Sequence, residues 1–310
     1  MSRRPKRTPY WLHAALAFLL VLLIVVVVLP VNEEPKKVHE QSKAVAPINR
    51  PAIAESSVVY EEFQKAPARP SVKALPKISR AHALRQAETG IALIMDDVGY
   101  DLHALERVLA LPFGVTISIL PDAPYAAESA EMAHQAGSTV MLHLPMEPSN
   151  PKYRARMNES FLKINMSEVQ IRDHFIQALE QVPYVEGMNN HMGSLLTTLE
   201  EPMRWVMALC RERGLFFVDS KTAHNSIASN IAAEQGIEWA SRRIFLDHTV
   251  EDEDLRLAWK SALKCAKLKG SCIVIAHPHA ETLNFLEQQV QEGDLAYIRP
   301  LTSLLHPGGM

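Results

Sequence analysis

The chain has 310 residues, of which 47% are apolar, and a formal net charge of −3. Such a balance lacks the basic surface that nucleic-acid binding requires, so that class of protein is excluded. Three cysteines are too few for a disulfide framework; a bridge between Cys265 and Cys272 is conceivable, but small buried apolar side chains are the favoured interpretation.

The amino terminus has the pattern of a membrane anchor. Residues 1–10 form a basic tail, and residues 11–29 are almost entirely apolar. The apolar stretch 12–29 would span about 27 Å as a helix, close to the thickness of a bilayer core. Because flanking positive charge stays cytoplasmic, the sequence predicts a single-pass inner-membrane protein whose later residues are periplasmic. A cleaved signal peptide is the alternative, but the run is long for one and reaches Pro30 without a small-x-small site.

Residues 30–88 are expected to form a linker. They contain seven prolines and no glycine, and they show no sustained apolar period. Such a segment cannot bury enough apolar surface to offset its ordering entropy, so a disordered, semi-extended stalk is predicted, with a short helix at 81–89 as an option. All twelve glycines lie at or after Gly90, which places the turn-rich folded domain at residues 89–310.

The domain alternates short apolar runs with stretches of helical period. Apolar runs of strand length occur at 91–97, 115–120, 139–147, 186–194, 215–222, 242–248 and 271–279. Helices are predicted at 101–110, 124–135, 167–180, 200–213 and 251–267. This alternation predicts an α/β fold with a parallel sheet, and seven units suit a closed barrel. An open doubly wound sheet is the weaker alternative, because no glycine-rich phosphate loop follows the first run.

Six of these runs end in a residue that can bind metal or transfer protons. They are Asp96 with Asp97, His143, His191, Asp219, Asp247 and His277. One such residue alone is more often a structural histidine or a helix N-cap. The carboxyl ends of parallel strands converge on one mouth, however, so a shared site is the favoured interpretation.

The residue types at this mouth suit a metal-dependent hydrolase. One carboxylate and two imidazoles are a ligand set for zinc or a related divalent ion with an open position for water. Such an ion lowers the pKa of bound water and polarises a carbonyl. A second carboxylate could then act as general base and another histidine as general acid.

Five motifs carry a resemblance to a known family. MDDVG (95–99), LHLPMEP (142–148), NNHMGS (189–194), FVDSKT (217–222) and AHPH (276–279) occur in this order at the predicted strand ends. Over residues 89–305 the chain resembles the divergent polysaccharide deacetylases, the YibQ-like group. The resemblance implies the NodB-homology fold, a distorted (β/α)7 barrel, grouped with metal-dependent deacetylases of N-acetylated glycans.

The resemblance also implies roles for individual residues. Asp96 corresponds to the catalytic base and Asp97 to a metal ligand, with His143 and His191 as the imidazole ligands. Ordinary members of the superfamily supply both histidines from one H-S/T-x-x-H segment, which this sequence lacks. His143 and His191 would therefore have to meet from neighbouring strands.

The remaining candidates follow from the same resemblance. His277 corresponds to the general acid, with His279 as its rival, and Asp219 is expected to orient that acid or to touch the metal. Lys221 could pair with Asp219 or with Asp247. Further pocket candidates are Glu147, Asn190, Ser194 and Asp247.

Three functions are compatible with these features. The leading one is a zinc-dependent hydrolase that removes acetyl groups from a cell-envelope glycan such as peptidoglycan. The second is a catalytically inactive member of the fold that binds a glycan or an envelope partner. The third is a scaffold of an envelope complex. Presence of a base and an acid together, Asp96 and His277, favours the enzyme, since binding alone requires neither.

Overall fold

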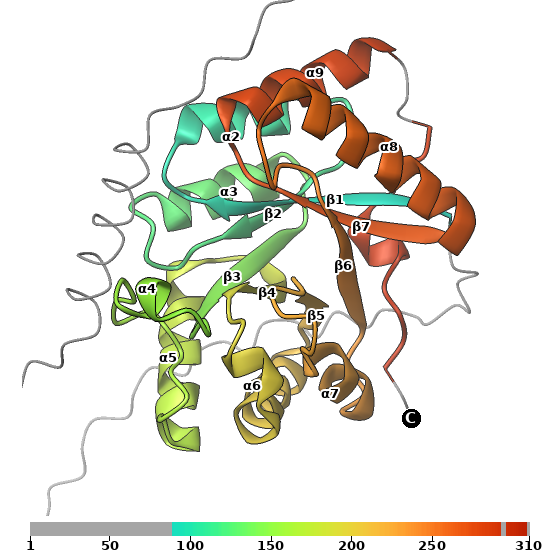
Figure 1. Ribbon diagram of the computed structural model, residues 1–310. Coiled ribbons are helices and arrows are strands. Elements are labelled where there is room, and N and C mark those ends of the chain that lie inside the picture. The colour runs from blue at the N-terminus through green and yellow to red at the C-terminus, as the bar shows by residue number, and fades with distance from the viewer. Residues whose placement is uncertain (1–88, 293–295, 309–310) are drawn as a thin grey trace, which may run out of the picture. The chain divides into compact units, whose positions relative to one another are not determined.

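The computed structural model describes residues 89–292 and 296–308. Seven strands form a closed parallel barrel in the order of the chain (Figure 1). They are β1 (Gly90–Val98), β2 (Thr116–Ile119), β3 (Val140–Met146), β4 (Val185–Met192), β5 (Phe216–Asp219), β6 (Trp239–Phe245) and β7 (Ser271–Ala276). Because β1 pairs with both β2 and β7, the predicted barrel is confirmed and the open doubly wound sheet is excluded.

Helices cover the outside of the barrel. They are α2 (Leu102–Leu109), α3 (Ala126–Gln135), α4 (Pro151–Arg154), α5 (Glu168–Gln181), α6 (Glu200–Arg213), α7 (Ala228–Glu234), α8 (Asp252–Lys269) and α9 (Ala280–Glu292), with 3-10 turns η1 (Leu196–Thr198) and η2 (Leu301–Ser303). Helices α2, α8 and α9 pack together on one side, while α5, α6 and α7 form a second group (Figure 1). The sequence did not predict α4, α7 or α9.

Two apolar layers hold this architecture together. Side chains on the outer faces of the strands pack under the helices in one large core. A smaller core fills the barrel and includes Ile94, Met141, Val218 and Ile275, and Leu304 from the carboxy-terminal segment belongs to it as well. Polar side chains collect at the mouth of the barrel, where this apolar filling ends.

Local signals explain where several helices start and stop. Helix α5 begins with a capping box in which Ser167 and Gln170 satisfy each other's backbone N–H groups. Helix α6 ends at Gly214, whose φ of 68° is the left-handed conformation that glycine adopts without strain. Both boundaries agree with the predicted ranges to within a residue.

One expectation about the cysteines is corrected. Cys265 of α8 and Cys272 of β7 are joined by a disulfide, because the turn at Gly270 folds the strand back along the helix and brings their Cα atoms to 5.7 Å. Cys210 is free and buried, and burial raises the pKa of its thiol. Small buried side chains were the expected state of all three, which holds for Cys210.

The predicted basic tail, membrane span and linker lie outside the described residues, as does nearly all of the optional helix at 81–89. Within the described part of the chain, no helix combines the length and hydrophobicity that crossing a membrane requires.

Candidate active site

A bulge in β1 brings two consecutive carboxylates to the mouth of the barrel. Neighbouring residues of a regular strand point to opposite faces, so Asp96 and Asp97 could not share a site on one. The register of β1 against β2 shifts between Met95 and Val98, and Asp97 adopts a φ of 57°. This irregularity turns both side chains toward the same side of the barrel. Asp96 is buried, while the side chain of Asp97 is 36% exposed.

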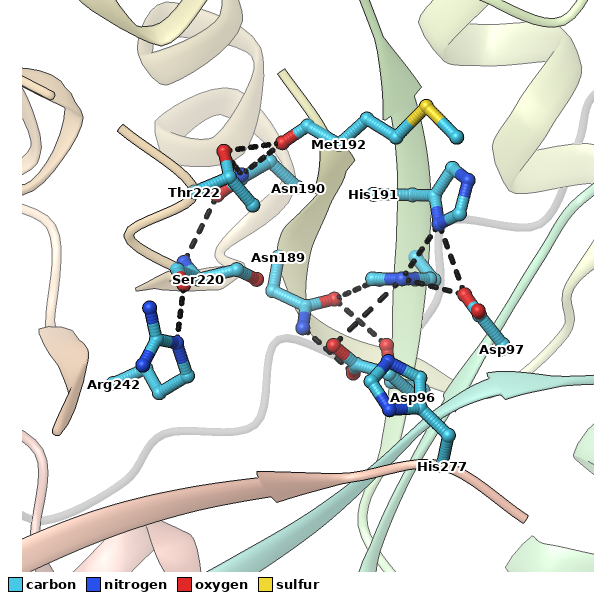
Figure 2. A network of polar contacts seen from close by, with 12 residues as sticks. Asp96, Asp97, Asn189, Asn190, His191, Met192, Ser220, Thr222, Arg242 and His277 are labelled. Atoms are coloured by element: carbon cyan, nitrogen blue, oxygen red, sulfur yellow. Dashed lines mark hydrogen bonds and ion pairs between the residues drawn. The ribbon is translucent and has the colours of Figure 1, made fainter. Parts of the chain in front are cut away.

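The two predicted histidine ligands meet from adjacent strands. His143 lies on β3 opposite Asn189 of β4, and His191 lies two residues farther along β4, on the same face as Asn189. Nε2 of His143 is 3.2 Å from Nδ1 of His191, and Oδ1 of Asp97 is 3.1 Å from the first nitrogen and 2.9 Å from the second. Figure 2 shows the side chains of His191 and Asp97 pointing toward one another.

The geometry of this triad fits a divalent metal ion. Oδ1 of Asp97 is buried and receives no acceptable hydrogen bond from any described residue, although both ring nitrogens are within contact distance. Three donor atoms around a tetrahedral zinc ion would lie about 3.3 Å apart, given metal–ligand distances of about 2.0–2.1 Å. The observed separations of 2.9–3.2 Å are close to that value, so Asp97, His143 and His191 form a candidate metal site.

Electrostatics favour a cation between these groups. Burial would raise the pKa of Asp97, but the close contacts and charges of His143 and His191 outweigh it and hold the pKa well below its usual range. Burial lowers the pKa of His143, yet Asp96 and Asp97 more than offset this, so the pKa is raised overall. The carboxylates thus attract positive charge into the site, which a proton or a metal ion can supply.

Asn189 connects a metal ligand to the candidate base. Its Nδ2 donates to Oδ1 of Asp96 at 2.8 Å, which identifies its Oδ1 as an acceptor. That oxygen accepts from Nδ1 of His143 at 2.7 Å and from the hydroxyl of Ser118 at 2.7 Å. His143 therefore carries its proton on Nδ1 and presents the Nε2 lone pair to the metal position.

Replacing Asn189 with leucine tests this connection. The Asn189→Leu variant loses the contact that sets the tautomer of His143, so its zinc affinity is expected to fall roughly 10- to 100-fold. A competitive zinc titration of the full-length chain measures this. Ser118→Ala is the matched control, because it removes a hydrogen bond to the same oxygen but leaves both His143 and Asp96 paired; equal affinities for the two variants would contradict the assigned role.

The candidate general acid is held by the carboxylate of Asp247, two residues after the end of β6. Oδ1 of Asp247 is 3.0 Å from Nδ1 of His277, and Oδ2 accepts from the backbone N–H of His277 and from the hydroxyl of Thr282. Burial lowers the pKa of His277, but the hydrogen bond and charge of Asp247, followed by the charges of Asp96 and Asp97, raise it to about 9. His277 is therefore protonated at neutral pH, with Nε2 left for a substrate.

This pair makes stability depend on pH. A histidine whose pKa is raised from 6.5 to about 9 stabilises the folded state fully below pH 6.5, and the contribution is lost as pH rises to about 9. Asp247→Asn is expected to remove most of it, about 3 kcal/mol at the upper limit. Urea unfolding at pH 6 and pH 10 measures the difference, which should be larger at pH 6. A destabilisation independent of pH would show that His277 is not charged.

Asp219 does not have the position expected of it. Its Oδ1 accepts from the backbone N–H of Lys221, its Oδ2 accepts from the hydroxyl of Ser226, and Nζ of Lys221 lies 3.7 Å from Oδ2. These contacts hold the loop after β5, in which Lys221 has a φ of 49°. The contact that orients His277 belongs to Asp247 instead, and Asp219 is not part of either cluster of metal-capable side chains in the described residues.

The other pocket candidates hold loops around the mouth. Glu147 is buried and accepts from the backbone N–H of Ile164, and Ser194 accepts from the backbone N–H of Ser149. Asn190 accepts from the backbone N–H of Ser220. His279 groups with Asp247 and His277, but both oxygens of Asp247 already accept hydrogen bonds, so this second cluster describes an oriented acid rather than a vacant metal site.

Sequence reasoning missed two residues at the mouth. Asn189 was hidden in the Asn-Asn-His run, where strand alternation from His191 would have placed it on the same face. Arg242 of β6 donates to the backbone carbonyl of Ser220 at 2.6 Å (Figure 2). It also donates to the backbone carbonyl of Lys221 at 2.7 Å and lies 3.7 Å over the ring of Phe245.

Arg242 also contributes charge to the mouth of the barrel. Burial lowers the pKa of its guanidinium, and the carboxylates of Asp219 and Asp96 act against that decrease. Its charge therefore reaches the candidate base. The only signal for it in the sequence was a pair of arginines, Arg242 and Arg243, within a strand, of which alternation turns one inward.

Fold and site together define a class of protein, a closed parallel (β/α)7 barrel with a carboxylate–imidazole cluster at its carboxyl mouth. Residues 93–302 match the family model described as divergent polysaccharide deacetylase. The chain belongs to this family, and the resemblance seen in the five motifs is confirmed.

Relatives and a solved structure agree with this assignment. The chain is 36% identical over 200 residues to the uncharacterized protein YibQ of Escherichia coli (strain K12), covering 64% of this chain and 62% of that protein. It is also 36% identical to an uncharacterized protein of Haemophilus influenzae, covering 65% and 71% of the two chains. The match thus spans less than two thirds of the E. coli protein. The crystal structure of an uncharacterized protein from Agrobacterium tumefaciens C58 has the same fold, with a TM-score of 0.64 and 18% identity over 69% of this chain and 88% of that one.

Proposed function

We propose that the barrel is a metal-dependent hydrolase that removes acetyl groups from an N-acetylated glycan of the cell envelope, with peptidoglycan as the first candidate. The observation that carries this proposal is the convergence of three ligand atoms, from Asp97, His143 and His191, beside a buried carboxylate and a protonated histidine. One of the three, Oδ1 of Asp97, is buried without a hydrogen-bond partner among the described residues. Membership of the divergent polysaccharide deacetylase family supports the same chemistry.

Asp97, His143 and His191 would hold the ion, with zinc expected from one carboxylate and two imidazoles. When bound, such an ion lowers the pKa of water and polarises the amide carbonyl. The three ligand atoms lie within 3.2 Å of one another, which supports this ligand set.

The chain's own residues then divide the proton transfers. Asp96, held in place by Asn189, accepts a proton from a water molecule while the oxygen of that water attacks the acetyl carbon. His277, oriented by Asp247, donates the proton on Nε2 to the amine nitrogen as the C–N bond breaks. The products are acetate and a free amino sugar; Asp96 then releases its proton to solvent, and His277 recovers a proton from solvent.

The expected setting is the periplasmic face of the inner membrane. The apolar stretch 11–29 behind a basic tail supports a single-pass anchor with a cytoplasmic amino terminus. The disulfide between Cys265 and Cys272 supports an oxidising compartment for the barrel. Protease added to spheroplasts should therefore digest the barrel without lysis; protection until lysis would contradict this location.

Acetate release tests the function. The full-length chain, loaded with zinc, is expected to release acetate from N-acetylglucosamine oligomers or peptidoglycan fragments, and chelation should stop the release. Binding of glycan without acetate release, with metal bound, would show instead that the barrel is a catalytically inactive binding protein.

A further inference from the structure

A cavity lies in the wall of the barrel, and none of the candidate metal ligands lines it. Its volume is about 170 Å³. It is bordered by the first residues of β6 and β7, Trp239 and Ser271, by Ser229 of α7 and by His306 of the carboxy-terminal segment. Lys221 of the loop after β5 also borders it, but neither the three candidate metal ligands nor Asp96 and His277 do, so the cavity is distinct from the site described above.

The cavity exists because two strands separate. Pairing between β6 and β7 begins only at Arg242 opposite Ile273, so the earlier residues of β6 do not pair with β7. Trp239 instead exchanges both backbone hydrogen bonds with His306, at 3.0 and 2.7 Å. The carboxy-terminal segment therefore runs beside β6 near α7 (Figure 1) and fills only part of the opening.

The polar lining of the cavity consists of hydroxyl groups and cations. It includes Lys221, Ser229, Ser241, Arg243, Ser271 and His306, and no carboxylate. Lys221 is close to Asp219, but within the described residues Arg243 makes no side-chain hydrogen bond or ion pair, and neither do the hydroxyls of the three serines. Apart from Lys221, five side chains that can form hydrogen bonds therefore border the cavity. Among the residues that line it, no carboxylate is present to pair with the guanidinium of Arg243.

Two of these groups, Arg243 and His306, are basic side chains that border the same cavity. The ring of His306 lies 4.6 Å from that of Trp239, which holds it at the cavity. Burial, and next the charge of Arg243, lowers the pKa of His306. An anion bound between the two side chains would be attracted by the guanidinium and would favour protonation of the imidazole.

We propose that this cavity binds a phosphate-type oxyanion, held by Arg243 and His306 and by the hydroxyls of Ser229, Ser241 and Ser271. A guanidinium group gives phosphate oxygens strong, charge-assisted hydrogen bonds, and hydroxyl groups can donate to the remaining oxygens. Arg243 and His306 are exposed, so the cavity is accessible from solvent on their side. The ligand can therefore be free phosphate or the phosphate group of a small phosphomonoester.

Isothermal titration of the full-length chain tests the proposal with inorganic phosphate and, separately, with glycerol 1-phosphate, at constant ionic strength. Saturable binding of one anion per chain is expected, and the tighter of the two probes identifies the source of the phosphate. Phosphate also binds metal ions, so the titration is repeated with chelated protein and with the Asp97→Asn variant, in both of which binding should persist.

Arg243→Gln is expected to weaken this binding about 10- to 100-fold, as loss of a hydrogen bond to a charged group does. Arg211→Gln is the matched control, because Arg211 is an exposed arginine on α6 that does not line the cavity. Absence of saturable binding, loss of binding in Asp97→Asn, or equal weakening by the two arginine variants would overturn the proposal. Each of these results is independent of acetate release.

Discussion

The Asp97→Asn variant is expected to lose stoichiometric metal while keeping its fold. Wild-type chain should bind about one divalent ion, and loss of a direct ligand should cost more than the roughly 10- to 100-fold in affinity that loss of a second-shell partner costs. Asparagine tolerates the φ of 57° at this position better than other residues, so the backbone of β1 has no reason to change. Elemental analysis after dialysis against a weak chelator measures metal content, and circular dichroism checks the fold.

A matched control distinguishes loss of a metal ligand from loss of one negative charge elsewhere on the protein. Asp173→Asn makes the same chemical change at an exposed position on α5, away from both clusters of metal-capable side chains in the described residues, and should retain wild-type metal content. His191→Ala should lose metal as Asp97→Asn does. Retention of a full equivalent of metal in both site variants would show that the ion, if any, is held elsewhere.

The second large effect is expected from His277→Gln. Positioned general acids contribute about 10²- to 10⁴-fold to rates, so the rate constant for acetate release should fall by that factor while metal content is unchanged. His279→Gln is the matched control, because His279 is the nearby rival whose ring centre lies 5.9 Å from that of His277. A loss confined to His279→Gln would transfer the acid role to that residue.

The same assignment predicts the alkaline side of the pH profile. His277 must be protonated to act, and its pKa is raised to about 9, so activity should persist at neutral pH and fall as pH rises through the pKa of this histidine. A bound cation would move that fall to lower pH by repelling the proton. Asp247→Asn removes the largest stabilising partner, so the fall should move further toward 6.5. If activity falls at the same alkaline pH in Asp247→Asn as in the wild type, the pairing of Asp247 with His277 is contradicted.

Much of this protein could be predicted from its sequence. Strand and helix periods are properties of short segments, which is why the seven strands and the helices beginning near Ser167 and Glu200 were recognised. Strand ends converge in any closed parallel barrel, so a shared mouth for Asp97, His143 and His191 followed from order alone. Short helices such as α7 lack a cap and a long apolar stripe, and they were therefore missed.

Only the tertiary structure decided how the polar groups divide into partners. Asp247 rather than Asp219 orients His277 because the loop after β5 folds Lys221 and Ser226 onto Asp219, whereas the end of β6 lies beside β7. The link from Asn189 to His143 depends on the register of β3 against β4. The contacts of Asp247 with His277 and of Asn189 with His143 join residues 30 or more positions apart, and they depend on register and loop path, which no local period encodes.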